Sequence, residues 1–320
     1  MTEREPHAGA SGAARARSLL KRLARIAGWA ISLAAIAFFV RLLLSNGIAV
    51  PGRGGWAIAG ISLAGALAYG LVVTMMAGLW ALLVLPPGVG AGLARPIAAG
   101  YMKGMFAKYL PGNVFHYAAR HALGRQLGIA HGRLAAAALV EIAMQIGAAC
   151  FVVVLLGQAV LAAMLPALPR LPWPLAFAIP LAGVAIAVAP RPARLRWLPR
   201  YPALRILGAF AGYVLFYLAF GALFLGLLAW SNGVLFDPLR VIPTASLAWL
   251  VGFVVPGAPA GAGLREATLA LASGESGDPS QATLAAIMLF RVATMGGDFL
   301  AFVGGWLLSR GPLPAAPAWQ

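Results

Sequence analysis

Six ionisable side chains lie in stretches of this chain that are otherwise apolar, and positive and negative charges are equal in number. They are Arg120, Glu141, Arg265, Glu266, Arg291 and Asp298. A charge at membrane depth is costly and usually faces a protein interior or a wet cavity. Equal numbers allow the six to pair and simply fix the packing of helices. Because a guanidinium group binds phosphate through two parallel hydrogen bonds, the three arginines could instead form one site for an anionic group.

The first of these arginines follows a predicted break in a helix. Pro111 lacks a backbone donor, Gly112 permits a tight turn, and Asn113 is a favourable N-cap. The spacing predicts a new helix that carries Arg120 on the same face as Asn113. A helix N-terminus with a positive side chain nearby is an anion-binding arrangement, and Lys108 adds to its charge.

A second break precedes the second arginine at the same distance. Pro256 and Gly257 lie nine residues before Arg265, the separation that is also found between the first Pro-Gly pair and its arginine. Gly261 and Gly263 let the backbone turn between the break and the arginine. This stretch therefore offers the same kind of site for an anion.

The two interrupted stretches, 97–126 and 256–274, are predicted to be re-entrant helical hairpins. Non-helical backbone at membrane depth is tolerated only where it is buried in protein or lines a cavity. The alternative is an ordinary amphipathic helix that lies on the inner surface of the membrane. The segments that follow, 134–141 and 284–291, align without gaps at an offset of 150. The sequence therefore also predicts an internal repeat, with copies that run parallel.

Composition places the elements around these residues in a membrane. Hydrophobic types make up 62% of the 320 residues and charged types only 10%, against roughly 25% charged residues in soluble domains. Since about 20 apolar residues span a bilayer core, we expect an all-α polytopic membrane protein with about seven transmembrane helices and the two hairpins. The predicted spans are 28–44, 56–85, 134–163, 173–189, 206–230, 239–255 and 282–308.

The distribution of basic residues predicts the orientation of these spans. With the N-terminus in the cytoplasm, the stretches on that side hold 17 Lys and Arg residues, and the outer loops hold 3. Basic residues accumulate on the cytoplasmic side, so we expect a multi-pass protein of the cell inner membrane. The organisation is then a basic cytoplasmic tail at 1–27, a transmembrane domain at 28–310 and a C-terminal tail at 311–320.

Several function classes are disfavoured by the sequence. The net charge of +16 is explained by the loops between spans, so no nucleic-acid partner is expected. The sequence contains no Walker A motif, no Cys/His cluster with metal-ligand spacing and no compact catalytic constellation. We therefore expect no enzymatic activity, no cofactor and no bound metal.

Two signatures resemble those of the lysylphosphatidylglycerol synthase transmembrane family, which is flippase-like. The first is Lys-Tyr-Leu-Pro-Gly-Asn at 108–113, with Arg120 downstream. The second is the Pro-Gly, Gly-x-Gly-Leu-Arg-Glu run at 256–266, in which Ala-Pro-Ala widens the glycine turn; Arg291 and Asp298 also fit. The resemblance covers roughly residues 25–310. It implies a membrane domain that moves lipids between leaflets, without the aminoacyl-transferase domain of the bifunctional members.

The expected function is translocation or binding of a lipid with an anionic head group. Arg120, Arg265 and Arg291 would hold the head group, while Glu141 and Asp298 would balance or gate it. Two alternatives remain open. One is a secondary transporter of a small polar solute with an acidic proton relay, and the other is an accessory subunit of envelope lipid synthesis. The expected partners are membrane lipids and either a second copy of the chain or a separate lipid-synthesis enzyme.

Overall fold

Every secondary-structure element in the described part of the computed structural model is a helix. This part comprises residues 50, 52–86, 92–109, 115–164, 172, 174–188, 199–254, 261, 263–274 and 279–310. In chain order the elements are α2 (Gly55–Val84), α3 (Ala94–Gly104), the 3-10 helix η1 (Met105–Tyr109), α4 (Phe115–Gln126), α5 (His131–Leu156), α6 (Gln158–Met164), α7 (Pro174–Val188), α8 (Ala203–Asn232), α9 (Pro238–Val254), α10 (Leu264–Ala270) and α11 (Gln281–Leu308). No strand occurs in these ranges, which confirms the predicted all-α class.

Four helices are long and apolar enough to cross a membrane, namely α2, α5, α8 and α11. They have 26 to 30 residues, or about 39–45 Å at 1.5 Å per residue, against a bilayer core of about 30 Å. They coincide with the predicted spans 56–85, 134–163, 206–230 and 282–308. Two further predicted spans correspond to shorter helices, α7 with 15 residues and α9 with 17. The predicted span 28–44 lies outside the described residues.

Side-chain hydrogen bonds show which helix ends lie together. Three donors reach the last carbonyl groups of α2: Arg133 Nε, the Tyr201 hydroxyl at 2.9 Å and Arg205 Nη1 at 2.5 Å. At the opposite end of α2, Arg53 donates to the carbonyl oxygen of Trp230 at 3.3 Å. Helix α2 therefore runs antiparallel to α5 and α8. The arginines at its C-terminus satisfy carbonyls that have no partner within the helix, and their charge is favourable there.

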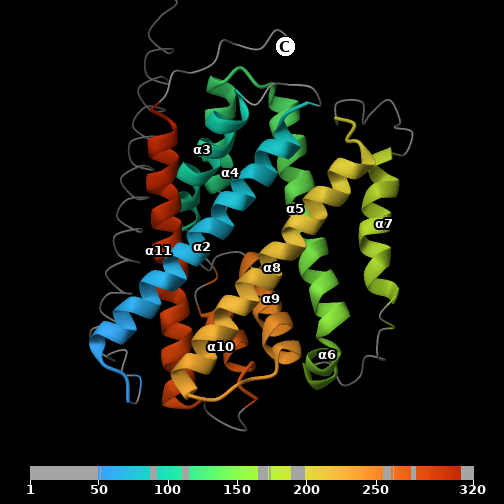
Figure 1. Cartoon of the computed structure of the whole chain (residues 1–320). Coiled ribbons are helices and arrows are strands. Elements are labelled where there is room, and N and C mark those ends of the chain that lie inside the picture. The colour runs from blue at the N-terminus through green and yellow to red at the C-terminus, as the bar shows by residue number, and fades with distance from the viewer. Residues whose placement is uncertain are drawn as a thin grey trace, which may run out of the picture.

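Helices α9 and α10 form a hairpin that begins and ends at one end of the bundle. The hydroxyl of Ser280, the N-cap of α11, donates to Asn232 Oδ1 at the end of α8 over 3.5 Å. Arg240, near the start of α9, donates to the carbonyl oxygen of Leu271, just past α10, over 3.3 Å. Figure 1 shows α9 and α10 in the lower half of the bundle and α3 and α4 in the upper half. The two hairpins therefore approach the middle of the bundle from opposite ends.

This arrangement differs from the sequence prediction of a span at 239–255 and of parallel repeats. Because α11 begins beside the end of α8, α9 does not carry the chain across the bundle. Pro256 cannot supply the backbone donor that would continue α9. Beyond it, Gly261 and Gly263 have positive φ values of +73° and +85°, which glycine adopts at little cost. Helix α10 ends beside the start of α9, so the described parts of the two interrupted stretches have an inverted arrangement and enter the bundle from opposite ends.

Small residues bring α2 and α11 close together. A Cβ atom on Gly297 would lie 2.7 Å from both the Ala66 carbonyl oxygen and the Gly70 nitrogen, and one on Gly65 would lie 2.8 Å from Ala293 Cβ. Such contacts leave no room for larger side chains and are typical of helix packing in membranes. They fix α11 against α2, and α11 supplies two charged residues of the candidate site.

Candidate functional site

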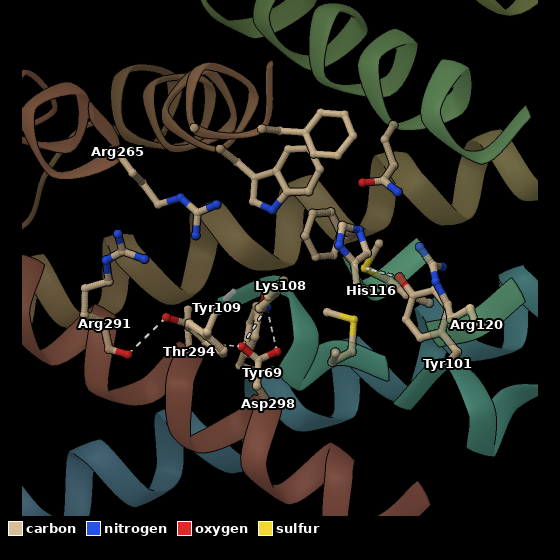
Figure 2. Close-up of a pocket in the computed structure, with 17 residues that line it drawn as sticks. Tyr69, Tyr101, Lys108, Tyr109, His116, Arg120, Arg265, Arg291, Thr294 and Asp298 are labelled. Carbon is tan, nitrogen blue, oxygen red and sulfur yellow. Dashed lines mark hydrogen bonds and ion pairs between the residues drawn. The ribbon is translucent and has the colours of Figure 1, made fainter. Parts of the chain in front are cut away.

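A polar cavity lies where the two hairpins meet the middle of α2, α8 and α11. Lys108 and Tyr109 of η1 line it from the first hairpin, Arg265 lines it from α10, and Arg291 and Asp298 line it from α11. Figure 2 shows these side chains around one space. The cavity volume is about 60 Å³, which is room for a few water molecules at roughly 10–15 Å³ each. In this conformation the protein's own side chains fill most of the site.

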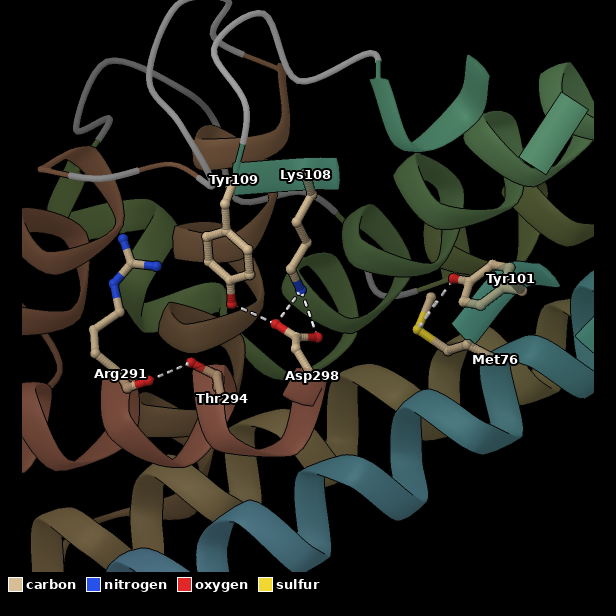
Figure 3. A network of polar contacts seen from close by, with 7 residues as sticks. All are labelled: Met76, Tyr101, Lys108, Tyr109, Arg291, Thr294 and Asp298. Atoms are coloured by element: carbon tan, nitrogen blue, oxygen red, sulfur yellow. Dashed lines mark hydrogen bonds and ion pairs between the residues drawn. The ribbon is translucent and has the colours of Figure 1, made fainter. Parts of the chain in front are cut away.

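The first charged contact in the cavity joins η1 to α11. Lys108 Nζ lies 2.8 Å from Oδ1 and 2.6 Å from Oδ2 of Asp298, whose side chain is fully buried. The Tyr109 hydroxyl donates to Asp298 Oδ2 at 2.5 Å. Figure 3 shows both side chains reaching from η1 to this one carboxylate. A buried carboxylate with two hydrogen bonds and an ion pair is well satisfied, so it fixes the tip of the first hairpin on α11.

The second charged contact joins α4 to α5. Arg120 Nη1 donates to both carboxylate oxygens of Glu141, at 3.0 and 2.8 Å, and both side chains are buried. The guanidinium carbon of Arg120 lies 4.7, 4.4 and 4.6 Å from the ring centroids of Trp80, Tyr101 and Tyr117. Cation–π contacts at these distances are favourable. Arg120 is therefore held by one acid and three aromatic rings.

The third charged contact joins α10 to α11. Arg291 Nε donates to Glu266 Oε1, and Glu266 Oε2 accepts a hydrogen bond from the backbone nitrogen of Gly263 at 2.6 Å. The second bond belongs to the N-terminal turn of α10, where an acidic side chain is favourable. Glu266 thus caps its own helix and fixes the second hairpin on α11.

Arg265 differs from the other three cations. Its side chain is buried, with 8% of the residue exposed, and its Nε has no hydrogen-bond partner in the described part of the chain. No acidic side chain within those ranges forms an ion pair with it. The guanidinium carbon of Arg265 lies 5.9 Å from the ring centroid of Phe220. After the three ion pairs are counted, the positive charge of Arg265 has no acidic partner among the described residues that line the cavity.

The sequence analysis placed the three arginines in a single site, and the structure separates them by their partners. All three line the cavity, but Arg120 and Arg291 are paired with acids on neighbouring helices. In Figure 2, Arg265 and Arg291 lie together on one side, and Arg120 lies on the other. Glu141 and Asp298 were predicted to balance or gate the head group, and in the structure they pair with Arg120 and Lys108. The acid that pairs with Arg291 is Glu266.

Some predicted residues fall outside the described ranges, and some lining residues were not predicted. Those outside are Pro111, Gly112, Asn113, Pro256 and Gly257. The lining residues that the sequence did not single out as site residues include Tyr69, Tyr101, Tyr109, His116 and Trp249. Only Tyr109 carried a signal, because it lies next to Lys108 in the first Pro-Gly motif. The other aromatic residues gave no signal, because an aromatic side chain in an apolar helix has the same sequence context whether it lines a cavity or packs against other helices.

The fold and the cavity together define an all-helical protein with four candidate membrane-crossing helices and a charged interior. Comparison with protein-family models, with curated proteins and with solved structures found no match. The likeness to the flippase-like family therefore remains a prediction from the two Pro-Gly signatures.

Proposed function

We propose that this protein binds the anionic head group of a membrane lipid in its central cavity and moves the lipid between the two leaflets. The observation that carries the proposal is Arg265, which is buried at the cavity and has no acidic partner in the described residues. The other cations, Lys108, Arg120 and Arg291, each pair with one acid. An anion from outside the chain would neutralise the charge that remains.

The energetics favour a functional explanation for this arginine. An arginine at the centre of a membrane-crossing segment costs about 2.5–3.5 kcal/mol on insertion scales, and an apolar side chain would fill the same space without that cost. The guanidinium group presents several donors in one plane and binds phosphate through two of them. Phosphate is the anionic group that most membrane lipids carry, so a phospholipid head group fits this chemistry.

The arrangement of the hairpins supports a translocation role. Interrupted helices that meet near the middle of the bundle, inside inverted repeats, are the usual setting of substrate sites in membrane transporters. We infer that α3–α4 and α9–α10 are re-entrant in the inner membrane, with the N-terminus in the cytoplasm. The basic asymmetry of 17 to 3 supports this orientation. The likeness of 108–113 and 256–266 to flippase-like signatures favours a lipid as the substrate.

One observation favours a second candidate function, the secondary transport of a small anion. The cavity volume of about 60 Å³ accommodates an inorganic anion more readily than a complete lipid head group. Binding of a head group requires the hairpin tips to move apart from α11. Transport of a small anion requires less movement, so the two functions predict different substrates for the same arginine.

Leaflet exchange in proteoliposomes tests the lipid proposal directly. The purified protein is reconstituted with trace phosphatidylglycerol or phosphatidylcholine carrying a fluorescent acyl chain, and dithionite is added outside. The wild type should expose phosphatidylglycerol from the inner leaflet to the quencher faster than protein-free liposomes do. Arg265→Gln should abolish this exchange, and Arg265→Lys should weaken it because the planar fork is lost. Arg310→Gln, an exposed arginine at the end of α11, serves as the matched control.

Two outcomes would overturn the lipid proposal. One is no exchange by the wild type beyond that of protein-free liposomes. The other is equal exchange by the wild type and Arg265→Gln. Counterflow of labelled phosphate in the same vesicles, lost in Arg265→Gln, would instead identify the small-anion transporter.

A further inference from the structure

The central cavity has a second polar end, which the proposed contact of an anion with Arg265 does not use. His116 and Gln145 line the same cavity as Arg265, and both are buried, with 8% and 3% of the residue exposed. In Figure 2, His116 lies on the side of Arg120, opposite Arg265 and Arg291. The cavity therefore joins a site for an anion to a region where the added polar groups are an imidazole and an amide.

The connection between α4 and α5 brings these two side chains to that end. Arg120 of α4 forms an ion pair with Glu141 of α5. His116 lies four residues before Arg120, and Gln145 lies four residues after Glu141. Residues four apart share one face of a helix. Each of the two side chains therefore lies about one helical turn farther than the ion pair from the connection at 127–130.

Both side chains can exchange hydrogen bonds with a hydroxyl group. His116 Nδ1 is buried and has no hydrogen-bond partner among the described residues. Buried polar atoms normally have a partner, so this atom points to a polar ligand at this end of the cavity. The amide of Gln145 donates one hydrogen bond to Glu141, and an amide has a further donor and a carbonyl acceptor. A hydroxyl group, which both donates and accepts, matches this combination.

Trp249 of α9 adds a rigid aromatic wall to the cavity. Its ring stacks on that of Phe253, with 4.8 Å between the centroids, and meets the ring of Phe216 edge-on at 5.7 Å. These contacts fix the orientation of the indole. An aromatic face presents a broad apolar surface, against which the C–H groups of a glycerol or a sugar can pack.

We propose that the cavity recognises a phospholipid whose head group carries hydroxyl groups beyond the phosphate, such as glycerol or a sugar. This inference rests on the proposed binding of the phosphate by Arg265. The hydroxyl groups contact His116 and Gln145, and the carbon atoms of the head group pack on Trp249. The cavity thus selects among anionic lipids by the chemistry of the head group and not by charge alone.

Two lipids of equal charge test this selection. Phosphatidylglycerol and phosphatidylethanol with identical acyl chains each carry one phosphodiester, but only the first has free hydroxyl groups. Each is titrated into the purified protein in detergent, and the affinity is taken from the rise in melting temperature. The wild type should bind phosphatidylglycerol about fivefold more tightly, which is the contribution of one neutral hydrogen bond. Equal affinities would overturn the inference.

Two substitutions locate the selection within the cavity. Gln145→Leu and His116→Phe remove hydrogen-bonding atoms at similar size, so each should bring the two affinities toward equality by weakening the binding of phosphatidylglycerol. Gln158→Leu is the matched control, because Gln158 of α6 is not among the residues that line the cavity, and it should keep the preference. A wild-type preference in both Gln145→Leu and His116→Phe would overturn the inference.

The result is separable from that of the leaflet-exchange assay. Arg265→Gln should weaken the binding of both lipids alike, because it removes the contact with the phosphate that they share. Preferential binding of phosphatidylglycerol without exchange in proteoliposomes would support the head-group site and refute translocation. Exchange of both lipids with equal affinities would support translocation and overturn the selection. No binding of either lipid would overturn both.

Discussion

The Lys108 ammonium group lies 2.6 Å from Oδ2 of Asp298 although the two residues are 190 positions apart in the sequence. Seven residues earlier on α11, Arg291 forms an ion pair with Glu266. In this pair α11 supplies the base and the hairpin supplies the acid. Two turns of α11 therefore hold Lys108 of the first hairpin and Glu266 of the second. Figure 3 shows the contact with Lys108. Any separation of the hairpins from α11 must break at least one of these ion pairs.

The contacts of Asp298 should contribute measurably to stability. Asp298→Asn leaves Lys108 without its charge partner in a largely buried site, so we expect a loss of about 3–5 kcal/mol in the free energy of unfolding. Tyr109→Phe removes one hydrogen bond to a charged group and should cost about 1.5–3 kcal/mol. Denaturant unfolding in detergent micelles measures both. Tyr213→Phe is the control, because the buried Tyr213 hydroxyl has no hydrogen-bond partner among the described residues. The stability of this variant should not fall.

A double-mutant cycle tests the pairing of Arg120 with Glu141. Each single change, Arg120→Met or Glu141→Gln, leaves a buried charge unpaired and should lower the free energy of unfolding by about 3–5 kcal/mol. The double variant should lower it by clearly less than the sum of the two single losses. The control cycle combines Glu141→Gln with Arg291→Met, which form no ion pair in the structure. Those two losses should add to within about 0.5 kcal/mol. Strong coupling in the control cycle with none in the first would contradict the assignment of partners.

The packing of α2 on α11 should not tolerate a side chain at Gly297. The Cβ atom of Gly297→Ala would lie 2.7 Å from backbone atoms of α2, so the helices must separate and we expect a loss of about 1–3 kcal/mol. Gly226→Ala is the control, since its Cβ position on α8 has no other atom within 4 Å. Alanine favours a helix over glycine, so the control should be unchanged or more stable in thermal unfolding. A tolerated Gly297→Ala would be inconsistent with the close approach of these helices.

The direction of the second hairpin predicts the labelling of single cysteines. In a background with Cys150→Ala, cysteines at Gly52 and Ser280 should react with an impermeant thiol reagent in intact cells. A cysteine at Pro199 should be shielded, because it lies at the basic end of the bundle. Labelling at Ser280 distinguishes the inverted arrangement from parallel repeats, in which this position would face the cytoplasm. A shielded Ser280 together with a reactive Gly52 would disprove the inverted arrangement.

Acid should loosen the contact between α4 and α5. His121 Nε2 and His131 Nδ1 lie 2.8 Å apart, and burial, followed by the proximity of His131 and Arg125, lowers the pKa of His121. A base whose folded-state pKa is lowered stabilises the fold above its unfolded pKa of about 6.5, and this stability is lost as the pH falls below that value. The melting temperature should therefore drop between pH 7.5 and 5.5. His121→Gln should reduce the drop, and an unchanged pH profile in that variant would rule out this histidine as the cause.

The sequence alone predicted the all-α class of this protein and its four longest apolar helices. A content of 62% hydrophobic residues with 10% charged residues predicts long apolar helices, and the four longest apolar runs became α2, α5, α8 and α11. The buried ions were also predictable, because Arg120, Glu141 and Asp298 interrupt apolar segments. These features depend on local composition and on residues close together in the chain, which a sequence displays directly.

Only the tertiary structure decided the partners and the direction of the second hairpin. A 17-residue apolar helix has the same composition whether it crosses the bundle or turns back, and the contact of Ser280 with Asn232 shows which occurs. Likewise, three acids and four bases allow many pairings. Lys108 meets Asp298, and Arg265 has no acidic partner in the described part of the chain, because the hairpins approach α11 from opposite ends. Helix orientation fixes which side chains come within a few ångströms of each other, and no short-range pattern in the sequence encodes that orientation.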